Sequence, residues 1–292
     1  MSDVPSRIET AARAVQYFIM RMLPTEWASK LGSLTVKANV RANRPEILAG
    51  ARENLKFHFP EADDAAIDTM VDAFLDGVGR MMGEFAVMPR FIREGRLETE
   101  GLDAFKKIVG TRPIIAFGLH TGNWEIFGPL FQHENIPLTS FYMPPDDPFE
   151  RQVAEESRAR FGVRLLSPDA RGVREGMRVL RQNKVVMIFP DESLERRALG
   201  PLFGRPPHDK GNLAIAARLA RHTGASFVIC HSERIAPCRF KLKISAPFDL
   251  PLAEGRPDVL ADVAYLNGYV EPVVRANLPR WYFLDEPIVP IE

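Results

Sequence analysis

The residues best suited to chemistry in this chain are a histidine and a glutamate five positions apart, His120 and Glu125, within the segment HTGNWE. An apolar run at 113–116 precedes the segment, so we expect His120 to end a β-strand. Two helical residues at this spacing would point about 140° apart, so Glu125 fits better in the first turn of the next helix. There its carboxylate can accept a hydrogen bond from His120 Nδ1, leaving Nε2 to take a proton from a substrate hydroxyl. This is the base and orienting acid of acyl-transfer enzymes, without the serine.

The neighbours of this pair bear on whether the histidine is catalytic or incidental. A glutamate in a first helical turn is also favoured by the helix dipole alone. Gly122, however, permits close approach of the backbone, and Asn123 with the helix N-terminal amides is predicted to stabilise an oxyanion. Asp191, beside Glu192, also follows a predicted strand and is expected to bind an acceptor hydroxyl or an arginine. An aspartate there is equally a common turn former or helix cap.

Apolar periodicity predicts the elements that must position these residues. The first part, 1–100, is expected to be a helical segment that docks on a membrane or packs on the core, with helices at 4–22, 25–40, 45–57 and 63–88. The second, 101–292, is expected to be one compact α/β domain with strands at 114–119, 138–143, 163–166, 185–189, 226–231 and 240–244. Helices are expected between them at about 123–132, 148–161, 170–182, 211–223 and 258–277. Such alternation predicts a mixed, largely parallel sheet covered by helices, with a site at the strand carboxyl ends.

Bulk properties exclude several classes. The chain has 292 residues and a net charge of zero, which argues against bulk nucleic-acid binding. The two cysteines, Cys230 and Cys238, have no metal-type spacing and are expected to be buried thiols. The sequence contains no run of about 18 apolar residues, so we expect no transmembrane helix. The shorter apolar stretch at 14–23 suits a helix that lies on a membrane or docks on the domain.

Several motifs occur in an order that resembles a known family. HTGNWE at 120–125 is the most specific, and the others are ARENL at 51–55 with FPE at 59–61, the block from Tyr142 to Gly162 with Arg158 and Arg160, FPD at 189–191, PLFG at 201–204, and Gly211-Asn212 with 216–220. Together they resemble the lipid A biosynthesis (lauroyl/myristoyl) acyltransferases, within the glycerolphosphate acyltransferase-like superfamily. Two departures are that Met143 stands where the family usually has arginine, and that the N-terminal hydrophobic anchor is reduced.

The resemblance implies an acyltransferase of lipid A and lipopolysaccharide biosynthesis. It would move a fatty acyl chain from an acyl carrier protein thioester to a hydroxyl of a lipid A precursor, with His120 as base and Glu125 as orienting acid. No cofactor, metal or nucleic acid is implied. The reduced anchor points to peripheral attachment at the cytoplasmic face of the bacterial inner membrane.

Arginines supply candidate sites for a phosphorylated acceptor. Those at 171, 174, 178 and 181 fall on one face of a predicted helix. The planar guanidinium group of an arginine suits phosphate because it can donate two hydrogen bonds at once. A solvated surface is the alternative for any such stripe. With the resemblance, Arg158, Arg160 and Arg174 are the candidate substrate-binding arginines, together with Asn123 and Asp191.

Three other functions compete with this hypothesis. The same chemistry on another phospholipid, glycolipid or aminolipid is the nearest. A metal-dependent hydrolase with His120, Glu125 and Asp191 as ligands is more remote, because no second histidine is close in sequence. A membrane-binding module without catalysis would keep its function in a His120→Ala variant.

Overall fold

A seven-stranded sheet occupies the centre of the computed structural model, which describes residues 7–145, 147–252 and 257–288. The strands lie in the order β1-β9-β8-β2-β5-β3-β4. Every pairing is parallel except that of β8 with β9, so the predicted mixed, largely parallel sheet is confirmed. The strands are β1 (Leu97–Glu100), β2 (Ile114–Gly118), β3 (Leu138–Phe141), β4 (Arg164–Leu166), β5 (Val185–Ile188), β8 (Ser226–Ala236) and β9 (Arg239–Ile244). A separate hairpin pairs β6 (Ser193–Leu194) with β7 (Arg197–Ala198).

The two central strands explain where the site lies. Every residue of β2 and β5 is buried, as expected for apolar strands covered on both faces. Their parallel register pairs Phe117 with Ile188, so both strands end at the same edge of the sheet. His120 and Asp191 follow these ends closely, as the sequence predicts.

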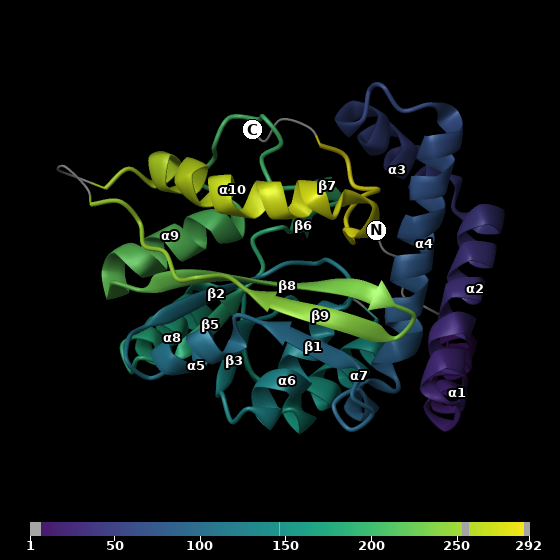
Figure 1. Cartoon of the computed structure of the whole chain (residues 1–292), viewed down its shortest axis with the longest axis horizontal. Helices are drawn as coiled ribbons and strands as arrows, with labels where there is room; N and C mark the ends of the chain where they lie inside the picture. The colour runs from purple at the N-terminus through teal and green to yellow at the C-terminus, as the bar shows by residue number, and fades with distance from the viewer. Residues whose placement is uncertain (1–6, 146, 253–256, 289–292) are drawn as a thin grey trace.

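Helices cover both faces of the sheet (Figure 1). On one face, α8, α9 and α10 pack over Ile115, Phe117, Val186 and Ile188. On the other, α5 and α6 pack over Ile114, Ala116, Val185 and Met187, together with Phe161, which directly follows α7. The bounds are α5 (Leu102–Ile108), α6 (Phe127–His133), α7 (Pro148–Arg160), α8 (Ala170–Leu180), α9 (Gly211–Thr223) and α10 (Val259–Ala276). Short 3-10 turns are η1 (Met88–Arg90), η2 (Trp124–Ile126) and η3 (Leu278–Arg280).

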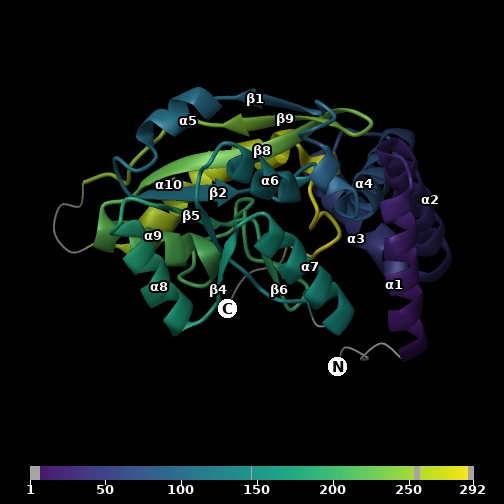
Figure 2. The same ribbon diagram turned by 90° about the horizontal axis from the view of Figure 1, so that it is seen from below.

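Four helices precede the sheet and stand together at one end of it (Figures 1 and 2). They are α1 (Arg7–Met22), α2 (Thr25–Asn43), α3 (Pro45–His58) and α4 (Asp64–Phe85), close to the predicted ranges; residues 4–6 of the first prediction lie outside the described residues. The α2–α4 contact is close because glycines meet there. A Cβ on Gly32 would lie 2.3 Å from the carbonyl oxygen of Gly79. Among the described residues, no helix has the length and apolar character needed to cross a membrane.

Candidate active site

His120 is held at the carboxyl edge of the sheet by Asp191. The backbone N–H of His120 donates to Asp191 Oδ2 at 2.7 Å, and its ring Nδ1 lies 3.0 Å from Asp191 Oδ1 and 3.1 Å from the Asp191 carbonyl oxygen. That carbonyl can only accept, so Nδ1 carries the proton. In the neutral ring Nε2 is then the acceptor, and it makes no hydrogen bond to any described residue.

Asp191 is fully buried behind the imidazole. Its Oδ2 also accepts from Trp281 Nε1 at 3.1 Å. With three donors aimed at it, the carboxylate is fixed in position, and it is absent from the lining of the adjacent cavity. The expectation that Asp191 binds an acceptor hydroxyl or an arginine is therefore wrong in geometry. The strand order brings this residue to the histidine, 71 positions away in sequence.

Glu125 has a different partner from the one predicted. Its Oε1 accepts from Arg158 Nη2 at 2.6 Å, with the two side chains 13% and 22% exposed. The predicted hydrogen bond from His120 Nδ1 to Glu125 is wrong, because Asp191 occupies that nitrogen. Glu125 nevertheless lines the same cavity as His120. The guanidinium of Arg158 also lies 4.5 Å from the ring centroid of Tyr142, and its Nη1 is buried without a hydrogen-bond partner in the described part of the chain.

The loop that follows His120 is fixed to β8. Gly122 has φ +61°, and a Cβ there would lie 2.4 Å from the Ser232 carbonyl oxygen, so the predicted close approach of the backbone is present. Asn123 N–H donates to Ser232 Oγ at 2.8 Å. The Asn123 side chain is 1% exposed and donates to Glu84 Oε2 at 3.0 Å. The backbone N–H and one side-chain N–H of Asn123 are thus engaged inside the protein, and its side chain does not line the cavity beside His120, so the prediction that Asn123 stabilises a substrate oxyanion is wrong in geometry.

Glu84 is the buried acid at the centre of this support. It is fully buried and accepts from Arg234 Nη2 at 2.8 Å and from Ser29 Oγ at 2.7 Å, besides Asn123. One carboxylate therefore joins α2, α4, β8 and the loop carrying His120. A buried charge so paired stabilises only while all its partners remain.

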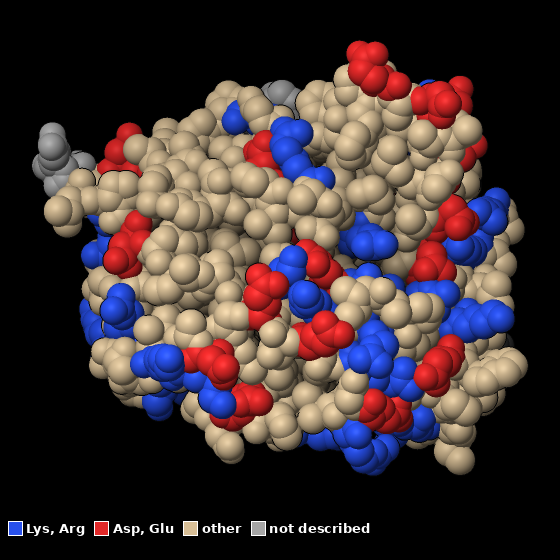
Figure 3. Space-filling view, in the orientation of Figure 1, with Lys and Arg blue, Asp and Glu red and all other residues tan. Residues whose placement is uncertain are grey.

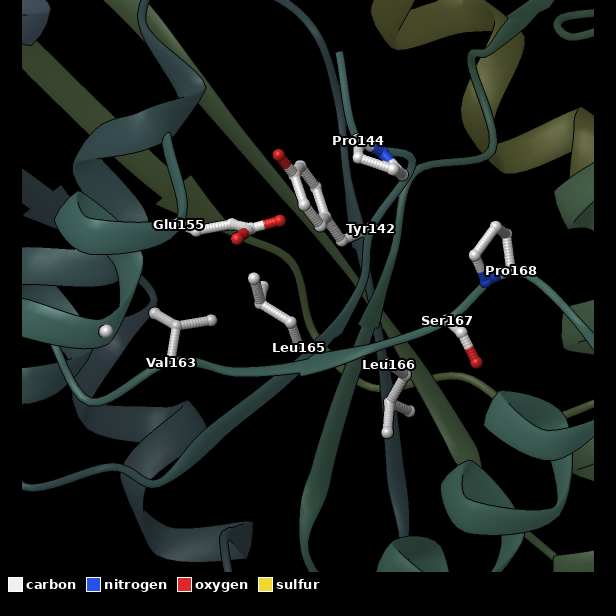
Figure 4. A pocket seen from close by; sticks show the side chains of 9 residues that line it. Tyr142, Pro144, Glu155, Val163, Leu165, Leu166, Ser167 and Pro168 are labelled. Carbon is white, nitrogen blue, oxygen red and sulfur yellow. The ribbon is translucent and has the colours of Figure 1, made fainter. Parts of the chain in front are cut away.

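A cavity of about 630 Å³ opens beside the imidazole. His120, Trp124, Glu125, Tyr282 and Phe283 line one part of it, and mainly apolar side chains, some from β3, α6 and α7, line the rest. A second, more open hollow of about 470 Å³ adjoins it and shares some of the lining (Figure 4). The side chains in common are Tyr142, Val163, Leu165 and Pro168. The site thus joins a proton acceptor to apolar space.

A second acid, Glu192, lines the cavity beside the Asp191 backbone. Its Oε1 accepts from the backbone N–H of Asn212 at the start of α9. Gly211 makes room for it, since a Cβ at that position would lie 2.6 Å from Glu192 Oε1. Burial, with a smaller contribution from the charge of Asp191, raises the pKa of Glu192 to about 7.

The remaining predicted arginines lie away from this cavity. Arg160 is exposed and lines a small surface hollow with Tyr17 and Phe149, and Arg174 is exposed on α8. The structure therefore brings only Arg158 to the cavity, and the α8 stripe is a solvated face. Met143, which stands where the resemblance predicts arginine, is 66% exposed at the rim. Basic and acidic side chains are interspersed over the face shown in Figure 3.

Sequence reasoning missed the contribution of the C-terminal segment. Trp281 holds Asp191, and the N–H of Tyr282 donates to the His120 carbonyl oxygen at 2.9 Å. The Phe283 ring centroid lies 4.9 Å from that of His120. The run Trp-Tyr-Phe was the available signal, because three consecutive aromatic side chains near a chain end need a partner surface. Cys230 and Cys238 are buried free thiols, as predicted.

The arrangement of acids also bears on metal binding. Among the described residues no three His, Cys, Asp or Glu side chains gather as ligands would. Arg158 places a cation against Glu125, one of the three ligands in the metal-hydrolase hypothesis. A divalent ion there would face a charge of its own sign.

The fold and the site define this chain as an α/β protein with a histidine–carboxylate pair at the carboxyl edge of a largely parallel sheet, beside a mainly apolar cavity. The profile of the bacterial lipid A biosynthesis acyltransferases matches residues 2–286, and the chain belongs to that family. No curated protein sequence matches significantly. Among solved structures, the 1-acyl-sn-glycerophosphate (LPA) acyltransferase PlsC from Thermotoga maritima is similar, with a TM-score of 0.39 and 14% identity over 90% of this chain and 96% of that chain.

Proposed function

We propose that this acyltransferase moves a fatty acyl chain from an acyl carrier protein thioester to a hydroxyl of a lipid A precursor. Family membership supports the reaction class and the choice of substrates. The observation that carries the proposal is the state of His120. Its Nδ1 is fixed by two acceptors on Asp191, while Nε2 makes no hydrogen bond to any described residue and the ring lines a largely apolar cavity.

The chemistry follows from that state of the ring. Nε2 takes the proton of the acceptor hydroxyl as its oxygen attacks the thioester carbonyl carbon. The tetrahedral intermediate then collapses, the carbon–sulfur bond breaks, and the imidazolium returns the proton to the departing thiolate. The Asp191 carboxylate stabilises the imidazolium formed between the two steps.

The ion pair of Glu125 and Arg158 supplies positive charge where the intermediate needs it. Glu125 holds the guanidinium in place at 2.6 Å, and no described residue offers Nη1 of Arg158 an acceptor within hydrogen-bond geometry. A thioester oxygen that becomes negative in the transition state is such an acceptor. In this proposal Glu125 acts through Arg158, and Asp191 acts through His120.

An exposed apolar face on α1 and α2 supports attachment to the membrane surface. Phe18, Met22 and Trp27 are 59%, 85% and 64% exposed. The basic residues Arg21 and Lys30 belong to the same two helices. Apolar side chains flanked by cations suit the interface of an anionic leaflet, which for this family is the cytoplasmic face of the inner membrane.

The test incubates purified protein with acyl carrier protein thioesters and a lipid A precursor, and identifies the product lipid by mass spectrometry. We expect wild-type transfer and a loss of at least about 100-fold in His120→Ala, the lower end of what a positioned base contributes. His222→Ala is the matched control, because that histidine is exposed on α9. Thermal melting of both variants separates loss of chemistry from loss of folding.

The acceptor is tested in the same reaction by offering other phospholipids and glycolipids. Transfer to one of these, and none to the lipid A precursor, would refute the proposed acceptor while keeping the chemistry. Equal activity of His120→Ala and wild type would refute the mechanism. Vesicle flotation with Phe18→Ser and Trp27→Ser tests membrane attachment separately, and unchanged binding to anionic vesicles would overturn that part.

A further inference from the structure

We propose that Glu192 is a substrate-binding residue whose neutral carboxyl group donates a hydrogen bond from Oε2 to an acyl carbonyl oxygen of the bound lipid acceptor. This role rests on the proposed function and adds to it a polar contact within the mainly apolar cavity. Three features support it: the place of Glu192 in the cavity wall, the one donor that the described residues direct at its carboxyl group, and the charges around it.

The carboxyl group of Glu192 is held in one position at the cavity wall. Its Oε1 accepts a hydrogen bond from the backbone N–H of Asn212 at the start of α9. The Asn212 side chain is fixed in turn, because its Nδ2 donates to the Phe189 carbonyl oxygen at 2.8 Å. The Glu192 carbonyl oxygen accepts from the N–H of Leu199 at 2.9 Å and from that of Gly200 at 3.4 Å. Backbone and side chain are therefore both anchored before a ligand binds.

The second oxygen, Oε2, is the one left for a ligand. No described residue donates to it, yet the atom is not sealed inside the protein. Because Glu192 lines the cavity, this is the space from which a ligand reaches the oxygen. Leu199 and Ile215 line the cavity as well and are apolar. A hydrogen bond made among such side chains is stronger than in water, because little water competes for it.

The surroundings of Glu192 favour its neutral form. The titratable groups on the neighbouring elements are Asp191 on the same segment, His120 after β2, the ion pair of Glu125 and Arg158, and Lys210 before α9. The Asn212 N–H and the dipole of α9 favour the ionised carboxylate. Burial, helped by the negative charge of Asp191, outweighs them and raises the pKa of Glu192 to about 7.

This protonation state defines the chemistry of the ligand atom. The Asn212 N–H takes the carbonyl oxygen of the neutral acid, so the proton lies on Oε2 and points to an acceptor. An acyl carbonyl oxygen is an uncharged acceptor that a lipid carries into apolar surroundings. A phosphate is a poor match, because the negative charge of Asp191 lies next to this position. Once Glu192 ionises, its oxygen repels the carbonyl oxygen and the contact is lost.

The test measures acyl transfer by Glu192→Gln and Glu192→Leu below and above pH 7. Glutamine keeps the acceptor for the Asn212 N–H and directs an NH₂ group to the cavity, so it donates without ionising. Wild-type KM for the lipid acceptor should rise about tenfold above pH 7, the contribution of one hydrogen bond. In Glu192→Gln, KM should be raised by about threefold or less and should not rise with pH, whereas Glu192→Leu should have the high KM at every pH. Glu195→Gln, 75% exposed on the β6–β7 hairpin, is the matched control and should follow wild type.

A binding measurement separates this contact from turnover. Methyl decanoate has an acyl carbonyl and no ionisable group, so any effect of pH on its affinity comes from the protein. Calorimetry should show about tenfold weaker binding to wild type above pH 7 than below it, and no such loss in Glu192→Gln. If Glu192→Leu fails to fold, as thermal melting would show, the comparison of wild type with Glu192→Gln still decides.

Two outcomes would overturn the role of Glu192. One is a Glu192→Gln protein that loses affinity above pH 7 as wild type does, and the other is a folded Glu192→Leu protein that binds methyl decanoate as tightly as wild type below pH 7. If binding depends on pH through Glu192 but no protein transfers acyl groups, the contact stands and the proposed function fails.

Discussion

Replacing Asp191 by asparagine separates the two acids of the site. The amide has one acceptor oxygen, and the donors at Asp191 Oδ2, the His120 N–H and the Trp281 indole, claim it. The NH₂ group then faces Nδ1 in place of Oδ1. Two donors meet there while the proton stays on Nδ1. That repulsion works against the Asp191 carbonyl oxygen, which still accepts from Nδ1, and favours the tautomer with the proton on Nε2, in which the ring has no free acceptor toward the cavity.

The expected loss follows from what a positioned base contributes. General-base catalysis supplies about 10²- to 10⁴-fold, equivalent to about 2.7–5.5 kcal/mol of transition-state stabilisation. The wrong tautomer removes most of this general-base contribution, so kcat/KM for acyl transfer should fall by about 10²- to 10⁴-fold in Asp191→Asn. The fold should survive, because the substitution keeps the shape of the side chain.

Ring nitrogen-15 chemical shifts measure the tautomer directly. The His120 signals, assigned with His120→Ala, should show a proton on Nδ1 in wild type and in Glu125→Gln, and on Nε2 in Asp191→Asn. Asp103→Asn, at an exposed position of α5, serves as the neutral control. If Glu125→Gln moved the proton and Asp191→Asn did not, the assignment of Asp191 as the orienting acid would be refuted.

Three further substitutions test the supports of the site. Folding raises the pKa of Glu192 from 4.5 to about 7, so the unfolded chain releases this proton at lower pH than the folded protein does. The free energy of unfolding therefore falls as pH rises from 4.5 to 7. In urea titrations between pH 4.5 and 8, wild type should lose up to about 3 kcal/mol of unfolding free energy relative to Glu192→Gln. Glu84→Ala should cost about 3–5 kcal/mol of unfolding free energy by leaving a buried arginine uncompensated, whereas the exposed Glu98→Ala should cost less than about 1 kcal/mol. Gly122→Ala and Gly95→Ala share a positive φ near +60° and its strain of about 1–2 kcal/mol, but only at Gly122 would the new Cβ meet backbone, so only that variant should also lose acyl transfer.

The elements of the sheet could be predicted because burial on both faces leaves a strong sequence signal. Strands β2 and β5 and helix α9 lie within one residue of the predicted ranges. Strand β1 was missed because it is an edge strand with the sequence LETE, which has one apolar residue and little burial. The short β6–β7 hairpin and α5 were missed for lack of a long enough periodic pattern.

Only part of the site could be predicted, because the order of the strands in the sheet decides which residues meet. His120 and the convergence with Asp191 followed from two strands ending at one edge, which the sequence shows. Which acid reaches Nδ1 depends on β5 lying beside β2, and strand order is not visible in a periodic pattern. The short spacing in sequence therefore favoured Glu125 as the partner of His120. In the structure Asp191 is the partner instead, because the pairing of β5 with β2 fixes it beside the ring.

The positions of the two acids give each a separate role in the proposed mechanism. Asp191 is sealed and fully accepting, so it can only hold a proton on Nδ1 and balance an imidazolium. Glu125 lines the cavity and holds a guanidinium, so in the proposed mechanism it positions the positive charge that stabilises the intermediate. In that mechanism one short loop carries both His120, the base, and Glu125, which holds the anion-stabilising Arg158. Because that loop is itself fixed to β8 through Gly122 and Asn123, the distance between these two residues is set by the sheet.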